Sequence, residues 1–109
     1  MKRMGMIIGI RAEDIAEYKR VHANVWPEIL ECLSRCNITN YSIFLREPEN
    51  LMFAYWEYVG DDFATDNQHI SEDPKTKEWW KICGPMQEPL DSRAESEWWA
   101  SMEEVFHLD

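Results

Sequence analysis

The sequence is poor in positive charge, in cysteine and in long apolar runs. Eleven lysines and arginines stand against 21 aspartates and glutamates, a formal net charge of −10. This balance excludes the basic surface that binding to nucleic acid or to an anionic membrane requires. Three cysteines in 109 residues are too few, and odd in number, for a disulfide framework. No apolar stretch approaches the roughly 20 residues of a membrane-spanning helix.

Targeting and phosphate-binding signals are missing as well. The apolar run near the N-terminus breaks at Arg11 and lacks a cleavage site, which is unlike a secretory signal peptide. No Gly-rich phosphate loop occurs, which argues against a nucleotide or sugar-phosphate site of that kind. We therefore expect a cytoplasmic protein that binds neither membrane nor nucleic acid.

Aromatic residues, in contrast, are abundant. The chain has six tryptophans, four tyrosines and four phenylalanines. Its length fits one domain, residues 1–109, and a chain of this size buries roughly two-thirds of its unfolded surface. One small core does not hide so many rings comfortably, so some should line a ligand pocket or a subunit interface.

The hydrophobic pattern predicts the order β-α-β-β-α-β, a ferredoxin-like α+β fold. The expected strands are residues 4–10, 39–46, 51–59 and 99–108, with a turn at 47–50. The expected helices are residues 13–36 and 75–84. Residues 60–74 look like a polar loop with at most a short helical turn, and residues 86–96 look irregular.

The first helix has one apolar stripe and one interruption. Residues at spacings of three and four form the stripe: Ile15, Tyr18, His22, Val25, Ile29, Leu33 and Cys36. Pro27 removes a backbone donor inside this pattern, so the helix either kinks or restarts with Pro27 in a new first turn. The interruption falls just after His22.

Two helices can cover only one face of a four-stranded sheet. Strands 4–10 and 51–59, however, carry apolar residues on both faces. A second copy of the chain, packed sheet against sheet, is the simplest cover for the other face. The pattern thus predicts a homodimer.

Tyr18 and His22 are the first candidates for chemistry. They lie four residues apart, so they are neighbours on one helix face. Histidine can give and take a proton near pH 7, and tyrosine can hold a hydroxyl group or orient the imidazole. The alternative is a core tyrosine beside a histidine with a purely structural hydrogen bond.

Further aromatic candidates leave a similar choice open. Trp79 and Trp80 point about 100° apart on a helix, so one can face the core while the other contacts a sugar or an interface. Tyr41 lies on a predicted strand and either belongs to the core or extends its hydroxyl into a pocket. For Trp98 and Trp99 we favour an interface or packing at the C-terminus over the site.

Metal and nucleophile chemistry have little support. The three histidines and three cysteines show no zinc-like spacing, and no nucleophile-elbow motif occurs. We expect neither a metal nor a covalent nucleophile.

Several segments resemble those of the L-rhamnose mutarotases, in order and along nearly the whole chain. They are Glu17–His22 followed by Trp26-Pro27-Glu28, Asn40–Ile43, Asn50–Ala54, Trp79-Trp80 and Glu104–Leu108. Together these matches are specific, whereas any one alone is weak.

The resemblance implies a dimeric ferredoxin-like fold and a cofactor-free isomerase. The reaction implied is interconversion of the α and β anomers of L-rhamnose or a related 6-deoxyhexose. The resemblance assigns proton donation to His22, as general acid/base, and sugar contacts to Tyr18, Tyr41, Trp79 and Trp80.

The chain departs from the family pattern before the last expected strand. The family has an Asn-Pro-Asp-Asn-Ser-Pro-like loop there, whereas this chain has Met86–Ser92 and a longer segment carrying Trp98-Trp99. This departure leaves the sugar open, with L-fucose as the alternative. Two rivals remain from other classes: a cofactor-independent monooxygenase of the same dimeric α+β barrel type, and a non-catalytic sugar-binding or dimerisation module.

Overall fold

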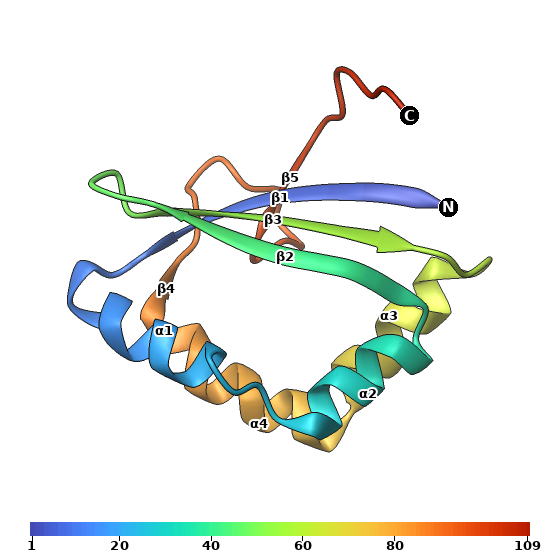
Figure 1. Ribbon diagram of the computed structural model, residues 1–109, viewed down its shortest axis with the longest axis horizontal. Coiled ribbons are helices and arrows are strands. Elements are labelled where there is room, and N and C mark those ends of the chain that lie inside the picture. Colours follow the sequence, from blue (N-terminus) through green and yellow to red (C-terminus); the bar gives the residue numbers. More distant parts are fainter.

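Five strands form one antiparallel sheet that curls over a layer of helices (Figure 1). The computed structural model describes all residues, from Met1 to Asp109. Its strands are β1 (Lys2–Ile10), β2 (Ile38–Arg46), β3 (Leu51–Tyr58), β4 (Gln87–Glu88) and β5 (Ala100–Met102). The order across the sheet is β2-β3-β1-β4, with β5 also paired to β1. This arrangement confirms the predicted ferredoxin-like α+β fold.

Two short strands share one edge of β1. β5 pairs with Gly5–Ile7, and β4 pairs with Gly9 and Ile10. The backbones of β1 and β4 approach each other closely at Gly9. A Cβ added to Gly9 would lie 2.7 Å from the carbonyl oxygen of Glu88. Only glycine permits this approach without displacing β4.

All four helices lie on one side of the sheet (Figure 1). They are α1 (Ile15–His22), α2 (Pro27–Arg35), α3 (Phe63–Glu72) and α4 (Pro74–Cys83), with short 3-10 turns η1 (Ala12–Asp14) and η2 (Gly84–Met86). The expected long helix is broken: α1 ends at His22 and α2 begins with Pro27 in its first turn. Of the two alternatives for Pro27, the restart is therefore confirmed.

The polar loop predicted for residues 60–74 is wrong, because a ten-residue helix, α3, occupies most of it. The side chain of Asp62 accepts from the backbone N–H of Thr65 at 3.2 Å, and Asp73 accepts from that of Thr76 at 2.9 Å. These two N-caps start α3 and α4. Gln87 and Glu88, expected to be irregular, form β4.

The last predicted strand is also too long. Only Ala100–Met102 pair with the sheet, and residues 103–109 run away from it without regular structure (Figure 1). Their apolar side chains are open to solvent, with Val105 89% and Phe106 80% exposed. No strand of the same chain lies alongside this tail to continue the ladder. We call residues 103–109 the C-terminal tail.

The core lies between the sheet and the helices. Along β3 every second side chain is buried on the helix side, beginning with Met52. The opposite sheet face carries Phe53 and Tyr55, partly covered, and Phe44, which is 64% exposed. The prediction that the helices leave one apolar sheet face uncovered is confirmed for this chain. None of the helices combines the length and the apolar character that crossing a membrane demands.

Candidate active site

A small open cavity lies where α1 faces the curled sheet. Its volume is about 140 Å³. It is lined by Ile10, Ile15, Tyr18, Lys19, His22, Ile43, Leu45 and Met52. A mostly apolar wall with a few polar groups is typical of small-molecule sites. A larger hollow of about 230 Å³ near Lys2 and Asp61 has no imidazole on its wall, so the smaller cavity is the better candidate for acid/base chemistry.

The backbone of α1 sets the tautomer of His22. Its Nδ1 lies 2.9 Å from the main-chain carbonyl oxygen of Tyr18, one helical turn earlier. A carbonyl oxygen can only accept, so Nδ1 carries a proton and donates it to this bond. In the neutral ring Nε2 is then the unprotonated nitrogen, with its lone pair available.

Aromatic rings hold the imidazole on two sides. Tyr18 stacks on His22 with ring centroids 4.1 Å apart and planes 19° apart. Trp79 meets it edge-on at 5.2 Å, and Trp26 packs against Trp79 at the same distance. Partial burial lowers the pKa of His22 below its ordinary value, while the bond to the Tyr18 carbonyl opposes this in part. The imidazole is therefore neutral at pH 7 and can accept a proton.

Tyr18 is buried, and its hydroxyl is hydrogen-bonded. Only 6% of the residue is exposed. Gln87 donates to the Tyr18 hydroxyl oxygen from its Nε2 at 3.1 Å. Burial raises the pKa of this phenol far above its ordinary value, with nearby Cys83 and Tyr41 adding to the rise. Tyr18 therefore keeps its proton at neutral pH.

A β-bulge turns Tyr41 toward the helices. Asn40 has a positive φ of 51°, and the register of β2 against β3 shifts between Thr39 and Ser42. The extra residue changes which face the following side chains point to. Tyr41 thus shares the face of Ile43, which lines the cavity. Although 42% of Tyr41 is exposed, burial around its hydroxyl raises its pKa to about 12.

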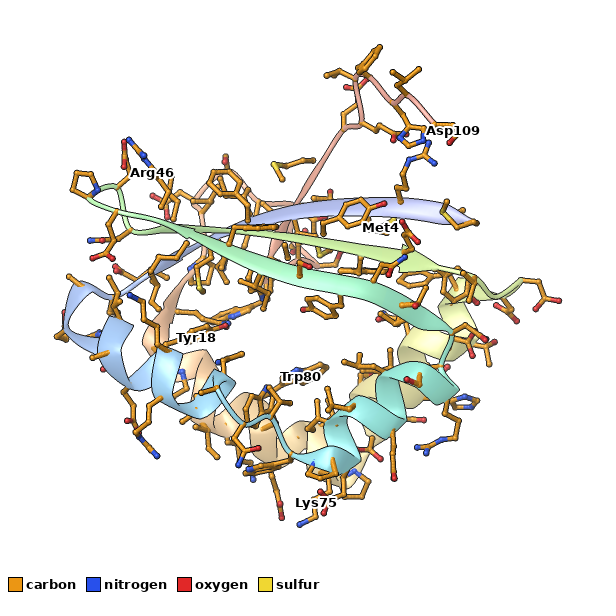
Figure 2. The ribbon with its side chains drawn as sticks, in the orientation of Figure 1. Met4, Tyr18, Arg46, Lys75, Trp80 and Asp109 are labelled. Carbon is orange, nitrogen blue, oxygen red and sulfur yellow. The ribbon has the colours of Figure 1, made fainter.

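The tandem tryptophans of α4 have different surroundings. Trp79 is buried in the core and touches His22, whereas Trp80 is 49% exposed. Figure 2 shows Tyr18 and Trp80 in the region between the helices and the sheet, approaching it from α1 and α4. The structure thus gathers Tyr18, His22 and Trp79 into one aromatic cluster, whereas Trp80 is half exposed and is not among the residues that line the cavity.

Three neighbours of the site escaped sequence reasoning. Gln87 bonds to Tyr18 from a two-residue strand, which has no periodicity to reveal it. Lys19 lines the cavity although it lies outside the apolar stripe. Trp26 packs on Trp79, and the sequence marked it only as part of the Trp26-Pro27-Glu28 segment, not as a site residue.

Trp98 and Trp99 also have distinct places. The indole Nε1–H of Trp98 donates to Oε1 of Gln87 at 2.7 Å, so Trp98 lies beside the site. Trp99 packs against the core cluster that includes Tyr18 and Trp79. No group of three or more His, Cys, Asp or Glu side chains is arranged to hold a metal ion.

Solved structures place this architecture in a fold class. An L-rhamnose mutarotase from Formosa agariphila superposes with a TM-score of 0.80 at 24% identity, over 100% of both chains. The tetracenomycin F2 cyclase of Streptomyces glaucescens, a type II polyketide cyclase, does so with 0.74 at 15% identity, over 100% of this chain and 98% of its own. The class is therefore an α+β fold whose curled antiparallel sheet forms a half-barrel, and fold alone does not decide between such activities.

Sequence comparison names the family. Residues 3–108 match the family model for L-rhamnose mutarotase. The L-rhamnose mutarotase of Lactiplantibacillus plantarum is 37% identical over 109 residues, and that of Bacillus subtilis 30%, each over 100% of both chains. This chain belongs to the L-rhamnose mutarotase family, whose members are isomerases, and the resemblance seen in the sequence is confirmed.

Proposed function

We propose that this protein interconverts the α and β anomers of L-rhamnose, with His22 as the group that transfers the proton. The observation that carries the proposal is an imidazole on the cavity wall whose Nδ1 is held by the Tyr18 carbonyl. Its Nε2 is thereby left as the reactive nitrogen. The family of the chain supplies the reaction class.

The reaction moves one proton and breaks one bond. The anomeric hydroxyl loses its proton to Nε2 of His22, and the bond from the anomeric carbon to the ring oxygen breaks. Its electron pair goes to the ring oxygen, which takes up the proton that imidazolium returns. The open aldehyde rotates, and the same steps in reverse close the ring on the other face. General acid/base help of this kind typically contributes ~10²–10⁴-fold.

The neighbouring aromatic residues bind and orient the sugar. Tyr18 and Tyr41 keep their phenolic protons, since burial raises both pKa values, and they hydrogen-bond sugar oxygens. Trp80, which is half exposed, packs its indole on the sugar C–H groups, while Trp79 contacts the sugar beside His22. Enclosing the 6-methyl group contributes on the order of 1 kcal/mol.

A second copy of the chain covers the exposed sheet face in this proposal. Phe44 and Met102 lie on strands of that sheet and are 64% and 41% exposed. The C-terminal tail leaves from the same region, held at its start by an ion pair between Arg3 and Glu104 at 2.6 Å. Val105 and Phe106 beyond it find no cover within the chain. A homodimer formed sheet against sheet would bury both the face and the tail.

Saturation-exchange NMR on the anomeric protons tests the function. With L-rhamnose, saturation of the α signal should pass to the β signal faster than in the protein-free sample. Substitution His22→Ala should abolish the added exchange. His69→Ala is the matched control, because His69 is exposed on α3 and should leave the rate unchanged.

The outcomes separate the parts of the proposal. Absence of added exchange with L-rhamnose in the parent would remove the proposed substrate, and added exchange with L-fucose alone would replace it. Full activity in His22→Ala would remove His22 from the mechanism while leaving the reaction in place.

A further inference from the structure

A chain of two hydrogen bonds joins an exposed tryptophan to the buried tyrosine of the site. Trp98 Nε1 lies 2.7 Å from Gln87 Oε1, and Gln87 Nε2 lies 3.1 Å from the Tyr18 hydroxyl oxygen. Gln87 is fixed between them by β4, where its backbone pairs with Ile10. Residues 89–99, which lead from β4 to Trp98 and β5, belong to the segment that departs from the family pattern.

The direction of both hydrogen bonds follows from donor chemistry. An indole N–H can only donate, so the carbonyl oxygen of the Gln87 amide must face Trp98. The amide NH₂ then faces Tyr18 and donates to its hydroxyl oxygen. Since Tyr18 accepts there, its own phenolic proton points elsewhere, and the cavity that Tyr18 lines lies beside it.

We propose that Trp98, acting through Gln87, is a positioning residue that holds Tyr18 as a hydrogen-bond donor toward the bound sugar. The inference rests on the proposed mutarotase function and specifies that Tyr18 is the donor in its hydrogen bond to the sugar. A ring oxygen carries no proton and can only accept, and it gains negative charge as the ring opens. A donor fixed in advance stabilises such a charge without reorganising.

The proposal also accounts for the place of Trp98. Nearly half of this residue is exposed, at 48%, while its N–H is aimed inward at Gln87. The Arg93 guanidinium lies 5.9 Å from the centroid of the Trp98 ring and holds it by a cation–π contact. Trp99, the next residue, packs against the core cluster instead and takes no part in the chain of hydrogen bonds.

Substitutions at Gln87 test the direction of donation. Gln87→Met keeps the length of the side chain but leaves Tyr18 free to donate to the sugar. Gln87→Glu places a carboxylate, an acceptor only, where the amide NH₂ was, so it takes the Tyr18 proton away from the sugar. We expect kcat to fall about 10- to 100-fold in Gln87→Glu, the range for a hydrogen bond to a charged group, and less in Gln87→Met.

A double-mutant cycle tests the role of Trp98. Trp98→Phe keeps an aromatic ring and removes the N–H. The Gln87 amide can then rotate and present its oxygen, instead of its NH₂ group, to Tyr18. We expect kcat to fall about 2- to 10-fold, the range for a neutral hydrogen bond. In the Gln87→Met background the same change should have no further effect on kcat, because no amide remains to orient. Trp99→Phe is the matched control and should lower the melting temperature more than the rate.

Indole signals report the contact directly. In a ¹H–¹⁵N spectrum Trp98→Phe deletes one indole cross-peak and thereby assigns it. Gln87→Met should shift that same cross-peak while the protein stays folded.

Three results would overturn the inference while the parent enzyme still exchanges anomers. The first is a kcat in Gln87→Met as low as in Gln87→Glu. The second is additivity of the effects of Trp98→Phe and Gln87→Met on kcat. The third is a Trp98 indole cross-peak that does not shift in Gln87→Met. A parent enzyme without anomer exchange would instead overturn the proposed function, so the two failures are distinguishable.

Discussion

His22 lies face to face with Tyr18 and is also hydrogen-bonded to its backbone, so one residue controls both the position and the tautomer of the other. The ring centroids are 4.1 Å apart, and His22 Nδ1 is 2.9 Å from the Tyr18 carbonyl oxygen. Both contacts follow from the i, i+4 spacing in the last turns of α1. The spacing that suggested a pair in the sequence therefore also determines which nitrogen can react.

The pH profile should show the lowered pKa of His22. Burial disfavours the imidazolium, so the pKa lies below the ordinary 6.5. In the proposed mechanism the active base is the neutral imidazole, hence kcat/KM should be constant at neutral pH and fall as the pH drops through a midpoint below 6.5. Background-corrected exchange rates and the C2 proton shift of His22 should give the same midpoint. A midpoint at or above 6.5 would contradict the assignment.

Tyr18→Phe should reduce activity and leave the stack intact. The phenyl ring still packs on His22, but the hydroxyl proposed to contact the sugar is gone. We expect kcat/KM to fall about 10- to 100-fold, the range for loss of a hydrogen bond to a group that gains charge, and the His22 midpoint to stay in place. Tyr55→Phe makes the same chemical change on the opposite sheet face and should not alter the rate. Equal losses in the two variants would argue against a site-specific role for Tyr18.

Gly9→Ala should disturb the site from a distance. The new Cβ would lie 2.7 Å from the Glu88 carbonyl oxygen, so β4 must move and carry Gln87 with it. We expect a loss of about 1–3 kcal/mol in unfolding free energy, typical of overpacking, together with a lower exchange rate. Chemical denaturation and saturation exchange measure the two effects.

Gly5→Ala supplies the matched control on the same strand. Its Cβ would meet only the end of the Met102 side chain at 3.5 Å, an ordinary contact. This variant should keep both stability and rate. A Gly9→Ala protein as stable and active as Gly5→Ala would show that the close approach at β4 is not required.

Periodicity was enough to predict the first three strands and the interruption of the first helix. The apolar stripe from Ile15 to Cys36 is buried or half-buried at every position. In a two-layer fold an apolar helix stripe can be buried only against the sheet. Pro27 marked the interruption, since its missing N–H is harmless only in a first turn. The pair of Tyr18 and His22 followed from the same stripe.

The features that were missed depend on single side chains or on distant contacts. α3 has few apolar residues, and the Asp62 cap starts it, so a polar composition looked like a loop. Gln87 meets Tyr18 across 69 positions in the chain, which no local pattern can reveal. The apolar residues of the C-terminal tail looked like a strand because composition does not tell which chain would pair with them.

Asp66→Asn should lower stability at neutral pH. Tyr58 and Asn37 both donate to Asp66 Oδ2, and these bonds hold the pKa of the carboxyl below its ordinary 3.8. A lowered carboxyl pKa stabilises the fold above the unfolded value, and this contribution is lost as the pH falls through the folded value. The melting temperature of the variant should be lower than that of the parent at pH 7, and the gap should narrow below pH 3.8. A gap that does not change with pH would contradict a charge-dependent role.

Phe44→Glu should separate the proposed dimer. Phe44 is the most exposed large apolar side chain of the uncovered sheet face, at 64%, and a stable interface buries about 800 Å² on each partner. A buried carboxylate without a partner opposes association, so sedimentation should show a parent dimer and a Phe44→Glu monomer. Removal of the C-terminal tail after Met102 should weaken the dimer as well, because Val105 and Phe106 then no longer contribute apolar area.

The control for this prediction lies on the helix side. Leu30 is 53% exposed on α2, away from the uncovered face, so Leu30→Glu adds the same charge without touching the proposed interface. It should sediment like the parent. A monomeric parent, or equal effects of Phe44→Glu and Leu30→Glu, would mean that something other than a second copy covers this face. A dimer lost only in Phe44→Glu and in the truncated protein would identify the sheet face and the tail as one continuous interface.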